Sequence, residues 1–191
     1  NYVSEDGAVV NMRRDSGMEP FLINTSLGWK DLELRLIYDN YEFKDSLSYG
    51  EPPADSTQWV RIFRSLMGSA KYDFHLTDTI TISPQFTAQN QYPWELKTNP
   101  GRGNRKIEYD KYDLDVPCVV DFNENNHLLL GVAGYVETAR AIDTSYYGVS
   151  PGVYFNGSDH VSYNDIAGYA QYDLDTKWAD FSVGGRFESH S

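Results

Sequence analysis

Residues 112–122 read Tyr-Asp-Leu-Asp-Val-Pro-Cys-Val-Val-Asp-Phe, and this stretch indicates the fold. Its apolar side chains fall on every second position, while Asp113, Asp115 and Asp121 stand between them. Successive side chains of a β-strand point to opposite faces, so the stretch predicts a strand with one apolar and one polar face. The same alternation recurs at 32–39, 79–89 and 181–188.

The alternating runs come in pairs joined by short segments rich in Asn, Asp, Gly and Thr. Tight turns favour these residues, so each pair predicts a β-hairpin. We therefore expect an all-β, antiparallel, up-and-down arrangement of about eight strands in four hairpins. The expected hairpins are 20–28 with 31–43, 60–75 with 79–92, 107–122 with 127–140, and 162–174 with 178–189.

Longer polar segments, at roughly 44–58, 93–106 and 141–161, connect one hairpin to the next. Connections that are short at one end and long at the other are typical of outer-membrane barrels. About ten residues suffice for a barrel strand to cross a bilayer, and several of these runs are longer. We therefore predict that residues 1–191 form a segment of a transmembrane β-barrel.

Aromatic residues near both ends of the expected strands support this prediction, because barrels carry aromatic girdles at the two bilayer interfaces. Those near the short turns are Trp29, Phe74, Phe122, Tyr172 and Trp178, and those near the long segments are Tyr41, Phe43, Trp59, Tyr92, Trp94, Tyr109 and Tyr163.

Composition excludes several classes of protein. The chain has 191 residues and a net charge of −12, which argues against binding to nucleic acid, since phosphate binding needs a basic surface. A lone cysteine, Cys118, rules out an internal disulfide framework. Apolar runs are too short for a membrane-spanning helix.

Two features leave alternatives open. A soluble β-sandwich or a lipocalin-like barrel also alternates, but its apolar face points inward. Residues 55–70 fit either a capped helix, with Val60, Phe63 and Met67 on one stripe, or a strand, which we prefer. Pro84 and Pro117 each remove a ladder hydrogen bond, so we expect bulges there.

The C-terminal hairpin carries a recognisable pattern. Residues 166–174, Ile-Ala-Gly-Tyr-Ala-Gln-Tyr-Asp-Leu, precede a turn and a strand that ends in Gly184-Gly185-Arg186-Phe187-Glu188. This hairpin resembles the barrel of TonB-dependent outer-membrane receptors, in which a Tyr-Ala-Gln strand precedes one ending in Gly-x-Arg-aromatic-Glu. The turn at 76–80, Leu-Thr-Asp-Thr-Ile, also resembles the periplasmic turns of that family.

The resemblance implies a receptor in the bacterial outer membrane that imports a scarce nutrient of the siderophore, cobalamin or glycan class. Its barrel has 22 strands filled by an N-terminal plug, and TonB supplies the energy that moves the plug. We recognise no plug in this sequence, so the expected partners are outer-membrane lipid, a small nutrient, and, in the whole protein, the plug and TonB. The alternatives are a stand-alone eight-stranded outer-membrane structural or adhesion protein and a soluble ligand-binding β-sandwich.

The charge of the expected polar face also favours a large barrel. Ten acidic and four basic residues fall on it, and a narrow, dry interior would desolvate them at high cost. The acids are Glu33, Asp39, Asp73, Asp113, Asp115, Asp121, Glu137, Asp165, Asp173 and Glu188, and the bases are Arg35, Arg61, Lys71 and Arg186.

We expect no catalytic site, no metal site and no cofactor. Asp73 and His75 share a strand face in the way of an Asp/His protease, but solvated residues beside a turn explain them better. The four histidines are scattered, and none has a partner histidine at i+2 or i+4.

Substrate contacts are expected in the long connecting segments, because loops carry recognition and aromatic side chains dominate contact energy. The expected substrate-binding residues are Tyr49, Trp94, Arg102, Arg105, Tyr146, Tyr147, Tyr154 and Phe155.

Overall fold

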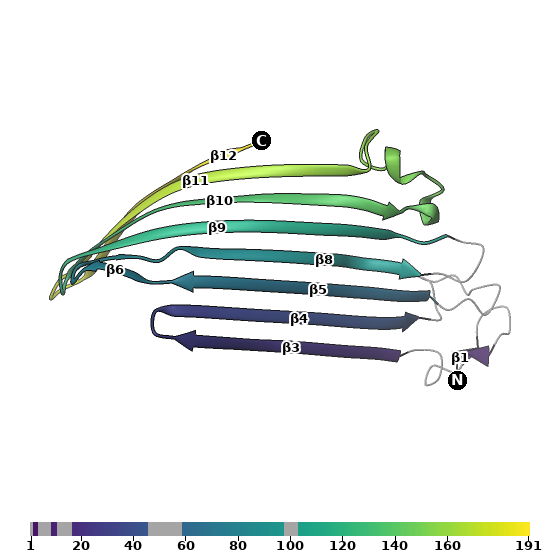
Figure 1. The fold of residues 1–191 in the computed structure, drawn as a ribbon, viewed down its shortest axis with the longest axis horizontal. Coiled ribbons are helices and arrows are strands. Elements are labelled where there is room, and N and C mark those ends of the chain that lie inside the picture. The colour runs from purple at the N-terminus through teal and green to yellow at the C-terminus, as the bar shows by residue number, and fades with distance from the viewer. Residues whose placement is uncertain (1, 4–8, 11–16, 46–58, 98–102) are drawn as a thin grey trace.

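The computed structural model describes residues 2–3, 9–10, 17–45, 59–97 and 103–191 (Figure 1). Most of them lie in antiparallel strands, as the alternation predicts. None of the described elements is a helix that could span a membrane. The strands are β1 (Tyr2–Val3), β2 (Val9–Val10), β3 (Gly17–Trp29), β4 (Leu32–Asp45), β5 (Trp59–Tyr72), β6 (Phe74–Thr77), β7 (Ile80–Ile82), β8 (Gln85–Lys97), β9 (Lys106–Asn123), β10 (Asn126–Asp143), β11 (His160–Asp175) and β12 (Asp180–His190).

One curved sheet of ten strands makes up the body of the molecule, and β1 pairs only with β2. Its long strands follow the order β3-β4-β5-β8-β9-β10-β11-β12, while β6 and β7 pair with one another and β7 also pairs with β9. Each long strand thus lies beside its neighbours in sequence, which confirms the up-and-down arrangement. Within the described residues β3 and β12 form the two edges, so the sheet is open and not a closed barrel.

The connections differ in length at the two ends of the sheet (Figure 1). Residues 30–31, 78–79, 124–125 and 176–179 make the short connections at what we call the turn end. At the opposite end, which we call the loop end, the described segment 144–159 joins β10 to β11. This asymmetry agrees with the predicted hairpins.

The prolines coincide with an interruption of the sheet. Pro84 lies with Ser83 between β7 and β8, and Asp73 separates β5 from β6, so the expected strands 60–75 and 79–92 are each divided. The backbone N–H of Ser83 donates to the carbonyl of Pro117, at 2.9 Å. In an antiparallel sheet the backbone nitrogen and the carbonyl of one residue face the same neighbouring strand. The Pro117 nitrogen, which carries no hydrogen, therefore also faces the break at Ser83-Pro84. No register shift occurs at Pro117, and the bulge expected there is absent.

The segment 59–72 is a strand throughout, and the helical alternative for residues 55–70 is wrong over its described part. The register explains this outcome, because β5 pairs with β4 from Asp45↔Trp59 to Leu32↔Tyr72 and with β8 on its other side. A strand held between two partners satisfies its backbone groups on both sides.

The register gathers the alternating apolar residues on one face of the sheet, which we call the apolar face. One row across the sheet runs Leu27, Leu34, Ala70, Phe86, Leu114, Gly134 and Ile166, and it ends at Ser189 on the edge strand β12. The adjacent row on the other, polar face runs Ser26, Arg35, Ser69, Thr87, Asp113, Tyr135, Asp165 and His190.

Over β10 and β11, exposure distinguishes the two faces. Val132 and Ile166, on the apolar face, are 58% and 67% exposed, whereas Asp165 and Ala167, on the polar face, are 7% and 3% exposed. Side chains crowd together on the concave side of a curved sheet, so the polar face is the concave one over β10 and β11. Within the described residues no second layer covers the apolar face, unlike the soluble β-sandwich alternative.

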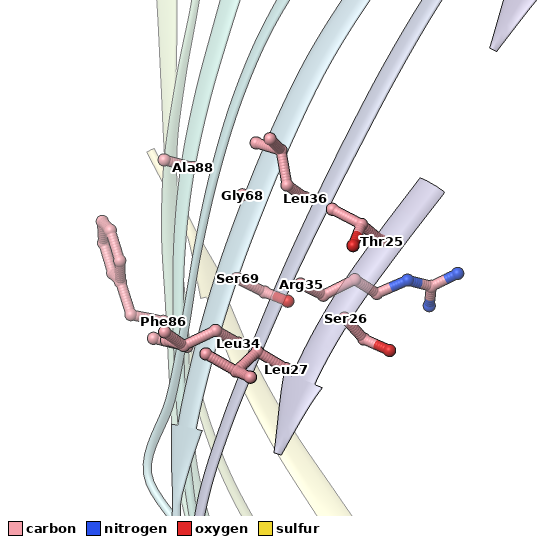
Figure 2. A pocket seen from close by; sticks show the side chains of 11 residues that line it. Thr25, Ser26, Leu27, Leu34, Arg35, Leu36, Gly68, Ser69, Phe86 and Ala88 are labelled. Carbon is pink, nitrogen blue, oxygen red and sulfur yellow. The ribbon is translucent and has the colours of Figure 1, made fainter. Parts of the chain in front are cut away.

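A shallow hollow on the apolar face lies over β3, β4, β5 and β8, where Gly68, Ala70 and Ala88 are flanked by larger side chains. Leu36 and Phe86 project to the hollow's side of the sheet, while Arg35 and Ser26 point away (Figure 2). The side chains on the hollow's side are apolar apart from Thr25, so they offer packing surface and no titratable group.

The apolar side chains form a band that ends in polar residues toward the loop end. On the central strands the band ends at Ala88 and Tyr112, which are paired, and the next row contains Asn90 and Asp110. On β4 it ends at Tyr38, before Asn40.

This outer limit of the band moves along the strands from one sheet edge to the other. On β3 it lies at Phe21, whose row reaches β8 at Tyr92, four residues beyond Ala88. On β12 it lies at Phe187, whose row reaches β9 at Val116, four residues short of Tyr112 on the turn-end side. The limit therefore shifts by eight residues across the eight long strands, about one residue per strand.

Candidate functional site

Four of the predicted substrate-binding residues meet at the loop end of β9, β10 and β11. The Tyr147 and Tyr154 rings lie 5.8 Å apart, and the Tyr154 and Phe155 rings lie 5.0 Å apart, edge to face. The Arg105 guanidinium donates to the Tyr147 hydroxyl, at 3.4 Å. We call Arg105, Tyr147, Tyr154 and Phe155 the loop-end cluster.

Backbone pairing and two short helical turns position these residues. Arg105 precedes β9 and exchanges two backbone hydrogen bonds with Leu96 of β8, at 2.8 and 3.0 Å. Tyr147 ends the 3₁₀ turn η1 (Ser145–Tyr147), and Tyr154 directly follows η2 (Pro151–Val153). Gly148 ends η1 with a φ of 68°, a left-handed conformation that glycine adopts without strain.

Asp143 organises the start of this segment, although it is not among the residues predicted from the sequence. Its Oδ1 accepts hydrogen bonds from the Ser145 backbone N–H, at 3.0 Å, and from the Ser145 hydroxyl, at 2.7 Å. Its Oδ2 accepts from the Asn104 side-chain amide, at 3.4 Å. The spacing Asp-Thr-Ser is typical of a side chain that caps a turn two residues on, and this signal was available in the sequence.

Thr144 and Ser145 join the two loop-end segments. Thr144 is fully buried and donates to the carbonyl of Val149, at 2.6 Å. The Ser145 hydroxyl oxygen accepts from the Asn104 backbone N–H, at 2.7 Å. Asn104 and Arg105 are thereby fixed against η1, and Arg105 can reach Tyr147.

Burial and charge shape the cluster's electrostatics. Burial raises the pKa of Tyr154 above its ordinary value, and the neighbouring Tyr147 raises it further. The adjacent His160 imidazole, 2.8 Å from the carboxylate, holds the pKa of Asp159 below its usual range. Arg105 supplies positive charge in an otherwise acidic protein.

The remaining predicted residues are placed only in part. The backbone of Trp94 lies in β8 and that of Tyr146 lies in η1. Tyr49 and Arg102 lie outside the described residues.

Asp73 and His75 do not form a dyad. Lys71 Nζ lies 3.1 Å from Asp73, and His75 instead lies 3.5 Å from Asp31 and 3.1 Å from the Thr81 hydroxyl. The loop-end cluster, for its part, offers aromatic faces, hydroxyl groups and one guanidinium. These groups can stack on a ligand, donate hydrogen bonds to it and neutralise an anion.

Comparison of the chain with family models, with curated proteins and with solved structures finds no significant match. The geometry of the sheet and of its loop end is therefore the ground for assigning a function.

Proposed function

We propose that this chain is a segment of the wall of an outer-membrane β-barrel. The observation that carries the proposal is the slanted apolar band on the uncovered face of a single sheet. A soluble sheet of this size would bury such a face under another layer. A lipid bilayer covers it without any further protein.

The slant has the magnitude that a barrel requires. Barrel strands tilt by about 35–45° from the axis, so a membrane boundary must cross them obliquely. A shift of about one residue, ~3.4 Å, for each strand spacing of ~4.8 Å corresponds to a tilt of about 35°. Apolar strands that stood upright in a membrane would instead show a limit at the same row on every strand.

Boundary side chains support the same orientation. The outer limit of the band carries Phe21, Tyr38, Tyr112 and Phe187, and Phe21 packs edge to face on Tyr38 at 6.0 Å. Aromatic rings favour the interface between acyl chains and headgroups. The concave polar face would then line the bore, and the loop end would face outward.

Within this proposal, the whole protein is a TonB-dependent receptor that imports a scarce nutrient of the siderophore, cobalamin or glycan class. The pattern of the β11–β12 hairpin supports this proposal, as does the acidic polar face, which suits a wide wall packed against a plug. The loop-end cluster would contribute to ligand recognition. The mechanism is binding and gating, without covalent chemistry.

Two adjacent substitutions test the orientation of the sheet. Val132→Lys places a charge in the apolar band and should weaken folding into phosphatidylcholine vesicles by about 2–4 kcal/mol. Ala133→Lys places the same charge on the polar face, opposite Asp115, and should fold into vesicles as the unmodified chain does. Folding is followed by protease protection.

Equal loss in both variants, or a chain that folds in buffer without lipid or detergent, would contradict the membrane proposal. The receptor proposal is tested separately by reading the gene upstream of this chain. A plug domain encoded in the same frame supports it, and a reading frame without one contradicts it.

A further inference from the structure

Three potential metal ligands meet on the polar face where β11 pairs with the edge strand β12. Asp165 lies directly opposite His190, and Glu188 lies two residues before His190 on the same face. Each of the three residues offers one ligand atom, and these atoms all lie within 4.8 Å of one another.

Asp165 is the buried member of the group. Its side chain is 3% exposed, whereas those of Glu188 and His190 are 40% and 67% exposed. His190 Nδ1 lies 2.6 Å from Asp165 Oδ2, yet that oxygen accepts no hydrogen bond of acceptable geometry from any described residue. A buried carboxylate oxygen without a donor is costly, and a bound cation would compensate for this cost.

Side-chain cations near the group do not replace such an ion. Arg186 contacts Glu188 and lies 6.0 Å from the Tyr169 ring, and among the described ion pairs Asp165 has His190 as its partner. Lys111 lies over the Tyr135 ring, at 4.1 Å. Tyr135 itself is the neighbour of Asp165 on β10. Among the described residues, the His190 imidazole is therefore the group that can balance the charge of the buried Asp165 carboxylate.

We propose that Asp165, Glu188 and His190 bind a divalent transition-metal ion of the zinc class. One imidazole nitrogen with two carboxylate oxygens suits such an ion, while Ca²⁺ and Mg²⁺ prefer oxygen ligands alone. Tetrahedral ligands at about 2.0–2.2 Å from zinc stand about 3.3 Å apart. The exposed His190 and Glu188 side chains can open to that spacing around the fixed Asp165. This proposal does not depend on the receptor function.

Zinc titration of the full 191-residue chain, folded in detergent and without a histidine tag, tests the proposal by calorimetry. We expect saturable binding of one Zn²⁺ that Ca²⁺ does not reproduce. His190→Ala and Glu188→Gln, both at exposed positions, should each weaken binding by about tenfold or more. Co²⁺ should give a visible absorption band that His190→Ala removes.

His127→Ala is the matched control. His127 also lies 2.6 Å from a carboxylate, that of Asp121, but this pair forms a hydrogen bond, and among the described residues it belongs to no group of three potential metal ligands. Its loss should leave zinc binding unchanged. Absence of saturable Zn²⁺ binding, an unchanged affinity in His190→Ala, or an equal loss of affinity in His127→Ala would overturn the proposal.

Discussion

At the scale of single residues, a glycine on β10 faces a tyrosine on β11. Gly131 and Tyr169 are paired on the polar face, and a Cβ at position 131 would overlap the tyrosine ring. The ring thus lies over the glycine, and its hydroxyl donates to Asp115 on β9, at 2.8 Å. One side chain thereby connects three strands.

We expect Gly131→Ala to lower the free energy of unfolding by about 1–3 kcal/mol, because the ring must leave its place. Gly168→Ala is the control, since a Cβ at position 168 would meet open space. Guanidinium unfolding of both variants in detergent measures the difference. An equal loss of stability in the two variants would contradict the claim that Gly131 is needed to make room for the Tyr169 ring.

The Tyr154 hydroxyl should lose its proton at a higher pH than an ordinary tyrosine does. Burial raises its pKa in the folded protein, so the neutral form is favoured, and the folded state loses stability as the pH rises above about 10. The difference in absorbance at high pH between the unmodified chain and Tyr154→Phe isolates this one group. A difference curve with its midpoint at or below the ordinary tyrosine value would contradict the burial of Tyr154.

Residue chemistry explains how far the candidate site could be predicted. Loop composition was enough to select Arg105, Tyr147, Tyr154 and Phe155, which the structure brings together. The contacts that position them could not be predicted, because Asn104 reaches Ser145 only through tertiary structure. The grouping of Asp165 with His190 could not be predicted either, since residues paired across two strands have no fixed spacing in the sequence.

At the scale of elements, the segment between β10 and β11 depends on its cap. Asp143→Ala removes the acceptor for the Ser145 backbone N–H and hydroxyl, at a cost of about 0.5–2 kcal/mol. We expect faster hydrogen exchange over 144–158 and little change in β4 or β5. Asp159→Ala, which removes an exposed partner of His160, serves as the comparison. Exchange that is equally fast in both variants would show that the cap is dispensable.

Strand periodicity predicted the hairpins well, because a face that meets one environment must repeat every second residue. The ends of strands were predicted less well. β8 extends to Lys97 and β9 begins at Lys106, beyond the predicted limits, because a neighbouring strand continues to accept backbone hydrogen bonds after the side-chain alternation fades. The break at Ser83-Pro84 depends on Pro117 beside it, a pairing that no local pattern reveals.

At the scale of the whole molecule, the slanted limit of the apolar band predicts a measurable orientation. Polarised infrared spectra of the chain in oriented bilayers should give strands tilted by about 35–45° from the membrane normal. The reason is that the slanted limit of the apolar band lies parallel to the membrane surface only when the strands are tilted from the membrane normal. Val132→Lys should reduce the oriented fraction. Strands that lie flat on the bilayer, or show no preferred direction, would contradict this arrangement.

The two edges of the sheet also constrain the architecture of any larger assembly. β3 runs from the loop end to the turn end, and β12 runs back the other way (Figure 1). If this sheet is part of a closed barrel in which every neighbouring pair is antiparallel, the additional strands must be even in number. They must therefore come as complete up-and-down pairs. Enlargement of this wall by duplication or fusion would therefore allow a closed barrel only when whole hairpins are gained.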